Sequence, residues 1–266
     1  METGIPISLQ PLIDAYLHTL EPWYVHFYGI YIHGSIALDA FEEVESDIDI
    51  VVLTQREWTS RQLMQLKAIH IQLLREQPLG KRLDVHYIPF CDLGRHGRAA
   101  LAPILRDGKF FVRATTESLD AVTCWITKHQ GIRLLGPEPS ALPLEVAWKD
   151  VLTAMRFNLD DYWAGKARCA YLFWFDYWVM TAIATLCRIL TTIEEREIIA
   201  KSPALLRWRD RFPQRWQFLL DEAWRIRHHL SRSSLYRDRI QRMKETLAFI
   251  EYVRERGGKA LEASSS

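Results

Sequence analysis

The sequence predicts an α+β fold for the N-terminal part of the chain and an all-helical fold for the C-terminal part. Segments rich in β-branched and aromatic residues, which are typical of strands, occur only before the Gly-Pro-Glu-Pro-Ser segment at residues 136–140. After that segment, apolar residues follow the helical period alone. Because proline and glycine interrupt regular structure, this segment is the best candidate for a linker. We therefore expect domains at residues 1–140 and 141–258, followed by a disordered tail at residues 259–266.

The N-terminal part mixes the two periodicities. Helical spacing of apolar residues predicts helices over residues 9–20, 59–76 and 118–130, with Gly131 as the stop of the last one. A short helix is expected from Ser35 to Phe41. The three predicted strands are Val25–His33, Asp47–Leu53 and Arg82–Pro89.

The C-terminal part is expected to consist of helices over residues 144–162, 170–192, 204–208, 216–230 and 235–256, with Gly257-Gly258 ending the last one. Its most apolar segment, Cys169 to Leu190, carries Asp176 and Arg188. Charged residues are costly inside a bilayer, so this segment is expected to be a buried helix rather than a membrane span.

Charge and cysteine content exclude several classes of function. The 34 Lys and Arg nearly balance the 33 Asp and Glu, and a net charge of +1 gives no argument for binding nucleic acid or a membrane. The arginine-rich stretch from Arg207 to Arg242 is expected to be a solvated face paired with nearby acids. The cysteines form no C-x-x-C pair, and the first residues lack the pattern of a secretory signal, so a cytoplasmic protein is expected.

A pair of aspartates carries the strongest chemical signal. Asp47 and Asp49 are two residues apart on a predicted strand and should share one face, while Ile48 and Ile50 enter the core. Two adjacent carboxylates repel each other unless a cation neutralises them, and their oxygen ligands suit Mg²⁺. Magnesium takes its remaining ligands from phosphates and water, so the pair predicts a metal–nucleotide site.

Two further segments fit the same site. Gly34 would let the backbone approach a ligand closely, and Ser35 would open a helix whose N–H groups attract phosphate. On the third predicted strand, Asp84 and His86 share one face. Asp84 is thus available as a third carboxylate, either at the metals or as the general base for an attacking hydroxyl.

At these residues the sequence resembles the DNA polymerase β-like nucleotidyltransferase superfamily, whose signature is Gly-Ser followed by D-x-D. More narrowly, GIYIHGSIALDAF and SDIDIVVLT resemble the adenylyltransferases that modify streptomycin and spectinomycin. The likeness continues in the segments 184–190, ATLCRIL, and 197–203, EIIAKSP. It covers nearly the whole chain and implies a polymerase β-like catalytic domain, a helical substrate-binding domain and an active site between the two.

The resemblance implies a reaction in which a substrate hydroxyl attacks the α-phosphate of ATP and pyrophosphate leaves. Two Mg²⁺ ions would be held by Asp47 and Asp49, with Asp84 where the relatives carry a glutamate base. Arg188 and Lys201 would face the nucleotide from the helical domain. A small cationic antibiotic is the implied acceptor, for which Asp160, Asp161 and Asp176 are weak candidate contacts.

The sequence departs from the relatives in one respect that concerns the acceptor. Their streptomycin-holding Trp-x-x-Gly-like segment cannot be placed on residues 163–166, which favours spectinomycin slightly. Two alternatives stay open at this point: the same chemistry with a protein or tRNA acceptor, and a catalytically idle nucleotide-binding protein. The near-neutral charge argues against tRNA, and the presence of all three acids argues against the idle protein.

Overall fold

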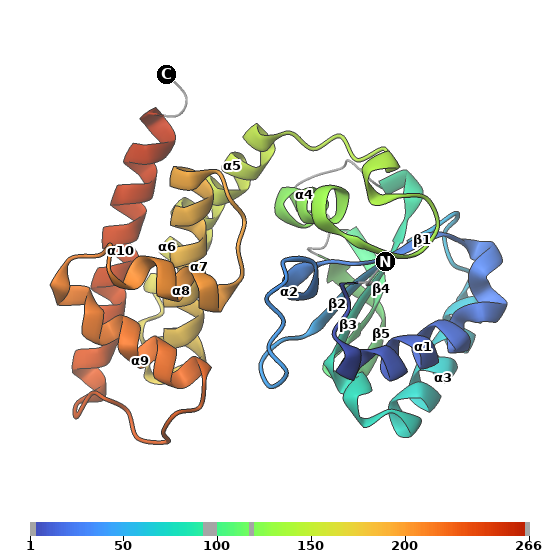
Figure 1. Cartoon of the computed structure of the whole chain (residues 1–266), viewed down its shortest axis with the longest axis horizontal. Helices are drawn as coiled ribbons and strands as arrows, with labels where there is room; N and C mark the ends of the chain where they lie inside the picture. Colours follow the sequence, from blue (N-terminus) through green and yellow to red (C-terminus); the bar gives the residue numbers. More distant parts are fainter. Residues whose placement is uncertain (1–3, 93–99, 117–119, 264–266) are drawn as a thin grey trace. The chain divides into compact units, whose positions relative to one another are not determined.

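The computed structural model describes residues 4–92, 100–116 and 120–263 (Figure 1). The chain forms two compact units, Met1–Ala147 and Trp148–Ser266. The division follows Ala147, so the proline- and glycine-containing segment at 136–140 lies within the first unit and not at its boundary. None of the described helices is both long and apolar enough to span a bilayer.

A six-stranded mixed sheet forms the centre of the first unit. Its strand order is β5-β4-β3-β2-β1-β6, with β2 and β3 parallel and the other pairs antiparallel. The strands are β1 Phe27–Ile32, β2 Ile48–Thr54, β3 Leu83–Pro89, β4 Ala100–Arg106, β5 Lys109–Thr116 and β6 Ile132–Leu135. This mixed sheet confirms the predicted fold class.

Three of these strands, β4, β5 and β6, were not predicted. The outer strand β5 has mostly exposed or half-buried residues, and β6 has only four residues, so neither gives a strong apolar pattern. Asp107 and Gly108 join β4 to β5 with φ values of 50° and 67°. Asp-Gly in this conformation is a typical two-residue hairpin turn, which was the available sequence signal.

Helices flank the sheet of the first unit. They are η1 Ile7–Leu9, α1 Gln10–Leu20, η2 Glu21–His26, α2 Gly34–Ala37, α3 Ser60–Glu76, η3 Pro78–Arg82, η4 Phe90–Asp92, α4 Ala121–Gln130 and η5 Pro139–Ala141. The expected helix over 59–76 is confirmed, and Thr59 caps it in a capping box with Gln62. The expected start of α4 at Ser118 lies outside the described residues. Gly131 is its C-cap as expected.

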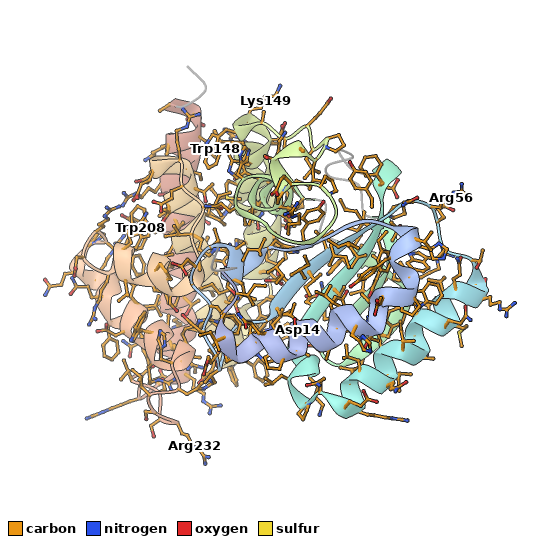
Figure 2. All side chains as sticks on the ribbon, turned by 45° about the vertical axis from the view of Figure 1, so that its right-hand side comes forward. Asp14, Arg56, Trp148, Lys149, Trp208 and Arg232 are labelled. Carbon is orange, nitrogen blue, oxygen red and sulfur yellow. The ribbon has the colours of Figure 1, made fainter. Side chains whose placement is uncertain are left out.

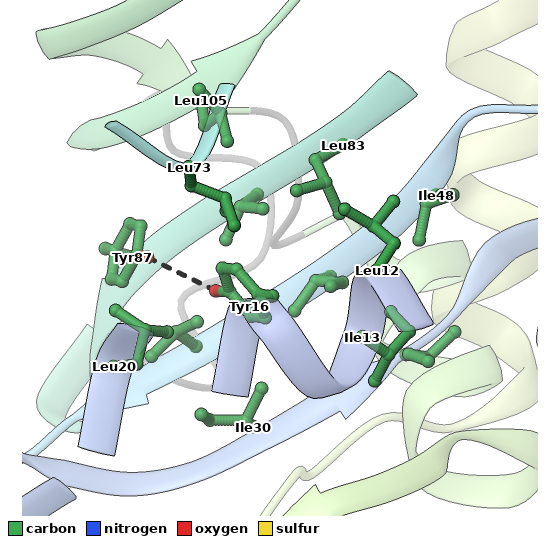
Figure 3. Close-up of a cluster of buried hydrophobic side chains, with 14 of the residues drawn as sticks. Leu12, Ile13, Tyr16, Leu20, Ile30, Ile48, Leu73, Leu83, Tyr87 and Leu105 are labelled. Carbon is green, nitrogen blue, oxygen red and sulfur yellow. Dashed lines mark hydrogen bonds between the residues drawn. The ribbon is translucent and has the colours of Figure 1, made fainter. Parts of the chain in front are cut away.

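Helices α1 and α3 cover one face of the sheet. Leu12 and Ile13 of α1 are buried against it, while Asp14 projects outward (Figure 2). Sheet residues such as Ile48 and Leu83 contribute to the same apolar cluster (Figure 3). The burial of Ile48 and Ile50 on this face is as predicted. The opposite face is therefore the one that presents Asp49 and Asp84.

One hydrogen-bonded chain crosses this core. The hydroxyls of Tyr16 and Tyr87 lie 3.2 Å apart (Figure 3), and that of Tyr87 lies 2.8 Å from Nε2 of His70. Nδ1 of His70 lies 2.8 Å from the carbonyl oxygen of Leu66, which can only accept. His70 is therefore protonated at Nδ1 and accepts from Tyr87 through Nε2, so the buried polar groups satisfy one another.

Helices are the only regular secondary structure among the described residues of the second unit. Its elements are α5 Trp148–Phe157, the π-helix η6 Asn158–Trp163, α6 Ala164–Ala167, η7 Ala170–Trp174, α7 Asp176–Glu195, α8 Lys201–Arg209, η8 Gln214–Trp216, α9 Gln217–Arg227 and α10 Arg239–Ala263. The absence of strands confirms the prediction. The expected helix over 170–192 is divided at Phe175, whose backbone is extended.

The last helix is longer than predicted. Helix α10 continues through Gly257 and Gly258 to Ala263, so residues 259–263 are helical and not a disordered tail. Residues 264–266 lie outside the described part. A Cβ atom at Gly257 would come within 2.7 Å of Cδ1 of Leu159. The glycine therefore permits close packing against η6 and does not end the helix.

The arginine-rich stretch is paired with acids, as expected, but part of it is buried. Glu222 is fully buried; its Oε2 accepts from Arg225 at 2.8 Å and its Oε1 from Arg242 at 2.9 Å. Burial would raise the pKa of Glu222, but hydrogen bonds from Arg225, Ser234, the Leu235 amide and Arg242 hold it at about 2, below the ordinary 4.5. The expectation of a solvated face is therefore wrong for Arg225 and Arg242.

Replacing Glu222 with Gln should lower the free energy of unfolding at pH 7 by about 3–5 kcal/mol, because two buried arginines then keep only the half-exposed Asp176 as a counter-ion. The depressed folded-state pKa means that the parent loses this stabilisation as the pH falls from 4.5 towards 2. The loss should be smaller in the variant. Urea unfolding at several pH values measures both effects, and equal stabilities at pH 7 would contradict this account.

Candidate active site

Two neighbouring strands, β2 and β3, bring two of the three predicted acids together. Asp49 on β2 pairs directly with Asp84 on β3. The backbone N–H of His33 donates to the carbonyl oxygen of Asp49 at 3.0 Å, which extends the β1–β2 ladder by one residue. Side chains that oppose one another across paired strands lie on the same face. His33, Asp49 and Asp84 therefore form a row on the face of the sheet opposite α1 and α3.

Gly34 leaves room for the carboxylate of Asp49, and the space beside this glycine is the seat of that carboxylate. Its φ is +66°, and a Cβ atom at this position would lie 2.0 Å from Oδ2 and 2.8 Å from Cγ of Asp49. Any other residue would thus carry both backbone strain and a collision with the carboxylate. The predicted close approach at Gly34 is present, and its nearest partner is the second aspartate of the D-x-D pair.

Two polar atoms beside this seat lack partners within the described residues. They are the hydroxyl of Ser35 and Nε2 of His33, both buried. Leaving a buried polar group unpaired costs about 1–3 kcal/mol, a cost that a bound ligand can remove. Burial, followed by the nearby His86, lowers the pKa of His33 to about 4. His33 is therefore neutral at pH 7 and adds no positive charge to the site.

The helix that follows Gly34 is shorter than expected. Helix α2 ends at Ala37 and does not reach Phe41. Strand β2 begins at Ile48, so Asp47 precedes the strand and is exposed. The expectation that Asp47 lies within the strand is therefore wrong, and its position depends on the segment between α2 and β2.

Asp84 is held from two sides. His86 Nε2 lies 2.9 Å from Oδ1 of Asp84, and Nε of Arg106 donates to Oδ2 at 2.9 Å. A carboxylate only accepts, so the Nε2–H of His86 donates to it, and Nδ1 of His86 lies 2.6 Å from the hydroxyl oxygen of Thr116. Burial opposes ionisation of Asp84, but the hydrogen bond and charge of His86, then those of Arg106, hold its pKa below the ordinary range.

The donor set for a metal is partly in place. Among the described residues, no group of three or more His, Cys, Asp or Glu side chains is arranged to hold a metal ion. Asp47 and Asp49 are the kind of carboxylate pair that suits Mg²⁺, which completes its shell with phosphates and water. Each oxygen of Asp84 accepts a hydrogen bond, Oδ1 from His86 and Oδ2 from Arg106, and keeps a second lone pair with which Asp84 could join them. Its role as a metal ligand stays a prediction.

The candidates in the second unit stay predictions as well, and the structure gives each a local setting. Nε of Arg188 on α7 donates to the carbonyl oxygen of Ile199 at 2.7 Å. Lys201 is the first residue of α8. Asp160 and Asp161 are exposed on the π-helix η6.

Asp176 has a structural partnership that the sequence did not reveal. Its carboxylate accepts from Arg242 at 2.6 Å and from Arg225 at 3.2 Å. Two arginines thus already neutralise this acid, which weakens the case for Asp176 as a contact for a cationic substrate.

Sequence reasoning missed the partners of Asp84. The alternation of Asp84 and His86 on one strand face was visible, but His86 was given no role. Arg106 lies at the end of β4, a strand that was not predicted, so nothing placed it near β3. His33 was predicted only as the last residue of a strand, with no part in the site, and the structure shows it buried beside the two aspartates.

A mixed sheet carrying Gly-Ser, a D-x-D pair and a third aspartate on an adjacent strand, followed by a helical unit, defines the class of the protein as a nucleotidyltransferase. Residues 172–254 match the family model described as aminoglycoside adenylyltransferase, C-terminal domain. The C-terminal part of the chain is thus similar to the C-terminal domain of the aminoglycoside adenylyltransferases. The match lies within the second unit.

A solved structure supports the fold over both units. The chain is similar to spectinomycin adenyltransferase AAD(9) from Enterococcus faecialis, a crystal structure obtained with ATP and spectinomycin. The TM-score is 0.64 at 17% sequence identity, and the similarity covers 92% of this chain and 98% of the other. A search of curated protein sequences found no match.

Replacing Gly34 with Ala should displace the Asp49 carboxylate and lower ATP binding, because the added Cβ would occupy the position of Oδ2. The matched control is Gly258→Ala, since a Cβ at Gly258 meets nothing within 4 Å. Gly258→Ala should be stabilising by about 0.5–1 kcal/mol, because alanine favours a helix interior. Calorimetry and thermal unfolding compare the two variants. Parental ATP affinity in Gly34→Ala would rule out the proposed seat.

Proposed function

We propose that this protein transfers AMP from ATP to a hydroxyl of an aminoglycoside or spectinomycin-type antibiotic and releases pyrophosphate. The observation that carries the proposal is the carboxylate of Asp49 against Gly34, beside the Ser35 hydroxyl, which has no hydrogen-bond partner among the described residues. The match of residues 172–254 to the C-terminal domain of aminoglycoside adenylyltransferases supports the choice of acceptor class.

In this proposal, each residue of the site has a separate role in binding the metal ions or the nucleotide. Asp47 and Asp49 would hold the magnesium ions, which are expected to be two and which would stabilise the attacking and leaving oxygens. Gly34 makes room for the Asp49 carboxylate, and Ser35 offers a hydroxyl donor to a phosphate oxygen. Arg188 and Lys201 are proposed as cationic contacts for the nucleotide.

Asp84 is proposed as the group that accepts the proton of the attacking hydroxyl. His86 and Arg106 favour its ionised form, so the carboxylate is available to accept a proton at neutral pH. The same partners make it a weaker base, and aspartate reaches less far than the glutamate of the relatives. The hydrogen bonds to both oxygens fix the orientation of the carboxylate, which favours transfer of the proton from a hydroxyl held in one position.

A spectinomycin-type acceptor is proposed before streptomycin. The AAD(9) structure that this chain resembles contains ATP and spectinomycin. The streptomycin-holding segment could not be placed on the sequence either. Asp160 and Asp161 are the remaining acidic candidates for contacting a cationic acceptor, since Asp176 is paired with arginines.

Purified protein incubated with Mg²⁺ and [α-³²P]ATP should label one or more members of an aminoglycoside and spectinomycin panel. The product should be heavier by one AMP, with pyrophosphate released in equal amount. Asp47→Ala should abolish transfer and leave the fold intact, because removing one of two repelling acids costs little stability. Labelling of a protein or tRNA, with no antibiotic labelled, would contradict the acceptor. Unchanged turnover in Asp47→Ala would contradict its role at the metal.

Asp84→Asn separates the two roles considered for the third acid. If Asp84 accepts the proton, the variant should keep Mg²⁺–ATP affinity and lose turnover by about a hundredfold or more. If Asp84 is mainly a metal ligand, nucleotide affinity should fall as well. Calorimetry with ATP and steady-state kinetics distinguish the two, and full activity would exclude both.

A further inference from the structure

The segment that carries Asp47 has little regular structure of its own. It connects α2, which ends at Ala37, to β2, which begins at Ile48. Its internal bonds form a turn, in which the carbonyl oxygen of Glu42 accepts from the amide of Ser46 at 2.9 Å and from that of Glu45 at 3.2 Å. The amide of Glu42 in turn donates to the Ser46 hydroxyl at 3.0 Å. Because Asp47 follows this turn directly, the turn sets where its carboxylate lies.

Arg82, the residue before β3, holds this turn. Its Nε donates to the carbonyl oxygen of Ser46 at 3.0 Å, and its Nη2 donates to that of Glu42 at 3.1 Å. Nη1 donates to the carbonyl oxygen of Glu43, and Nη2 bonds that of Ser46 as well. The guanidinium carbon also lies 5.0 Å from the centre of the Phe41 ring. One side chain thus ties together three carbonyl groups and one aromatic ring.

The place of Arg82 in the chain gives this contact its meaning. Arg82 ends η3 and directly precedes Leu83, which pairs with Ile48 at the start of β2. Its main partner, Ser46, directly precedes Asp47. The contact therefore links Ser46, the residue before Asp47, to Arg82, the residue before the strand that carries Asp84. Asp47 itself lies outside the β2–β3 ladder, which begins with the pair Ile48 and Leu83.

We propose that Arg82 is a positioning residue for the reaction, which holds residues 41–46 so that the Asp47 carboxylate stands beside Asp49. The inference rests on the proposed function, in which these two acids bind a divalent ion with the nucleotide. A planar guanidinium with five fixed donors reaches several carbonyl groups at once, whereas the ammonium of lysine does not. Arg82 itself contacts neither the metal nor the substrate in this account.

The test measures divalent-ion binding directly. In Arg82→Lys and Arg82→Met, Mn²⁺ affinity in the presence of ATP should fall about 10–100-fold, as for residues that orient metal ligands. The readout is electron paramagnetic resonance of free Mn²⁺, with folding of each variant checked by circular dichroism. The matched control is Arg56→Met, which removes an exposed arginine of the same unit (Figure 2) and should bind Mn²⁺ as the parent does.

Two further readouts separate positioning from a general loss of structure. Amide hydrogen exchange of Glu45 and Ser46 should accelerate in the Arg82 variants, while that of the buried strands stays unchanged. Guanidinium ion at low millimolar concentration should partly restore Mn²⁺ binding in Arg82→Ala but not in Asp47→Ala.

Parental Mn²⁺ affinity in both Arg82→Lys and Arg82→Met would overturn the proposal while leaving the proposed function intact. A parent that binds no Mn²⁺ with ATP would instead overturn the proposed function, and the role of Arg82 with it.

Discussion

The close contact between Gly34 and the carboxylate of Asp49 is the constraint on which the rest of the site depends. It requires a residue without a side chain and with positive φ directly after β1, and it fixes the start of β2 against that turn. Because β2 lies between β1 and β3, whatever fixes Asp49 also fixes its distance to His33 on one side and to Asp84 on the other. The parallel pairing of β2 with β3 then places Asp84 directly beside it.

The second constraint is charge. Three carboxylates in one region repel one another, and the three acids differ in how far neighbouring groups of the protein offset this repulsion. Arg106 and His86 satisfy Asp84, so this acid is held without a metal. His33 stays neutral because it is buried. Arg82 donates hydrogen bonds to backbone carbonyl groups and not to these acids. Asp47 and Asp49 are therefore the carboxylates expected to bind a metal cation first.

Much of this arrangement was predictable because it follows from local patterns. The alternation of buried and polar residues around Asp49 and Asp84 predicted both strands and the faces on which the acids lie. The β3–β4 contact was not predictable in the same way. It depends on a hairpin whose outer strand has little apolar signal, so Arg106 could not be placed beside Asp84. The seat at Gly34 was expected for a ligand, whereas the structure shows that a side chain of the same unit occupies it.

Asp49→Asn tests the central claim most directly, because asparagine keeps the shape that fits against Gly34 and loses the charge. Calorimetric titration with ATP, with and without Mg²⁺, is the measurement. The account predicts that the variant stays folded and that its ATP binding no longer responds to Mg²⁺, whereas the parent binds ATP in a magnesium-dependent way. Magnesium-dependent ATP binding of parental affinity in Asp49→Asn would contradict it.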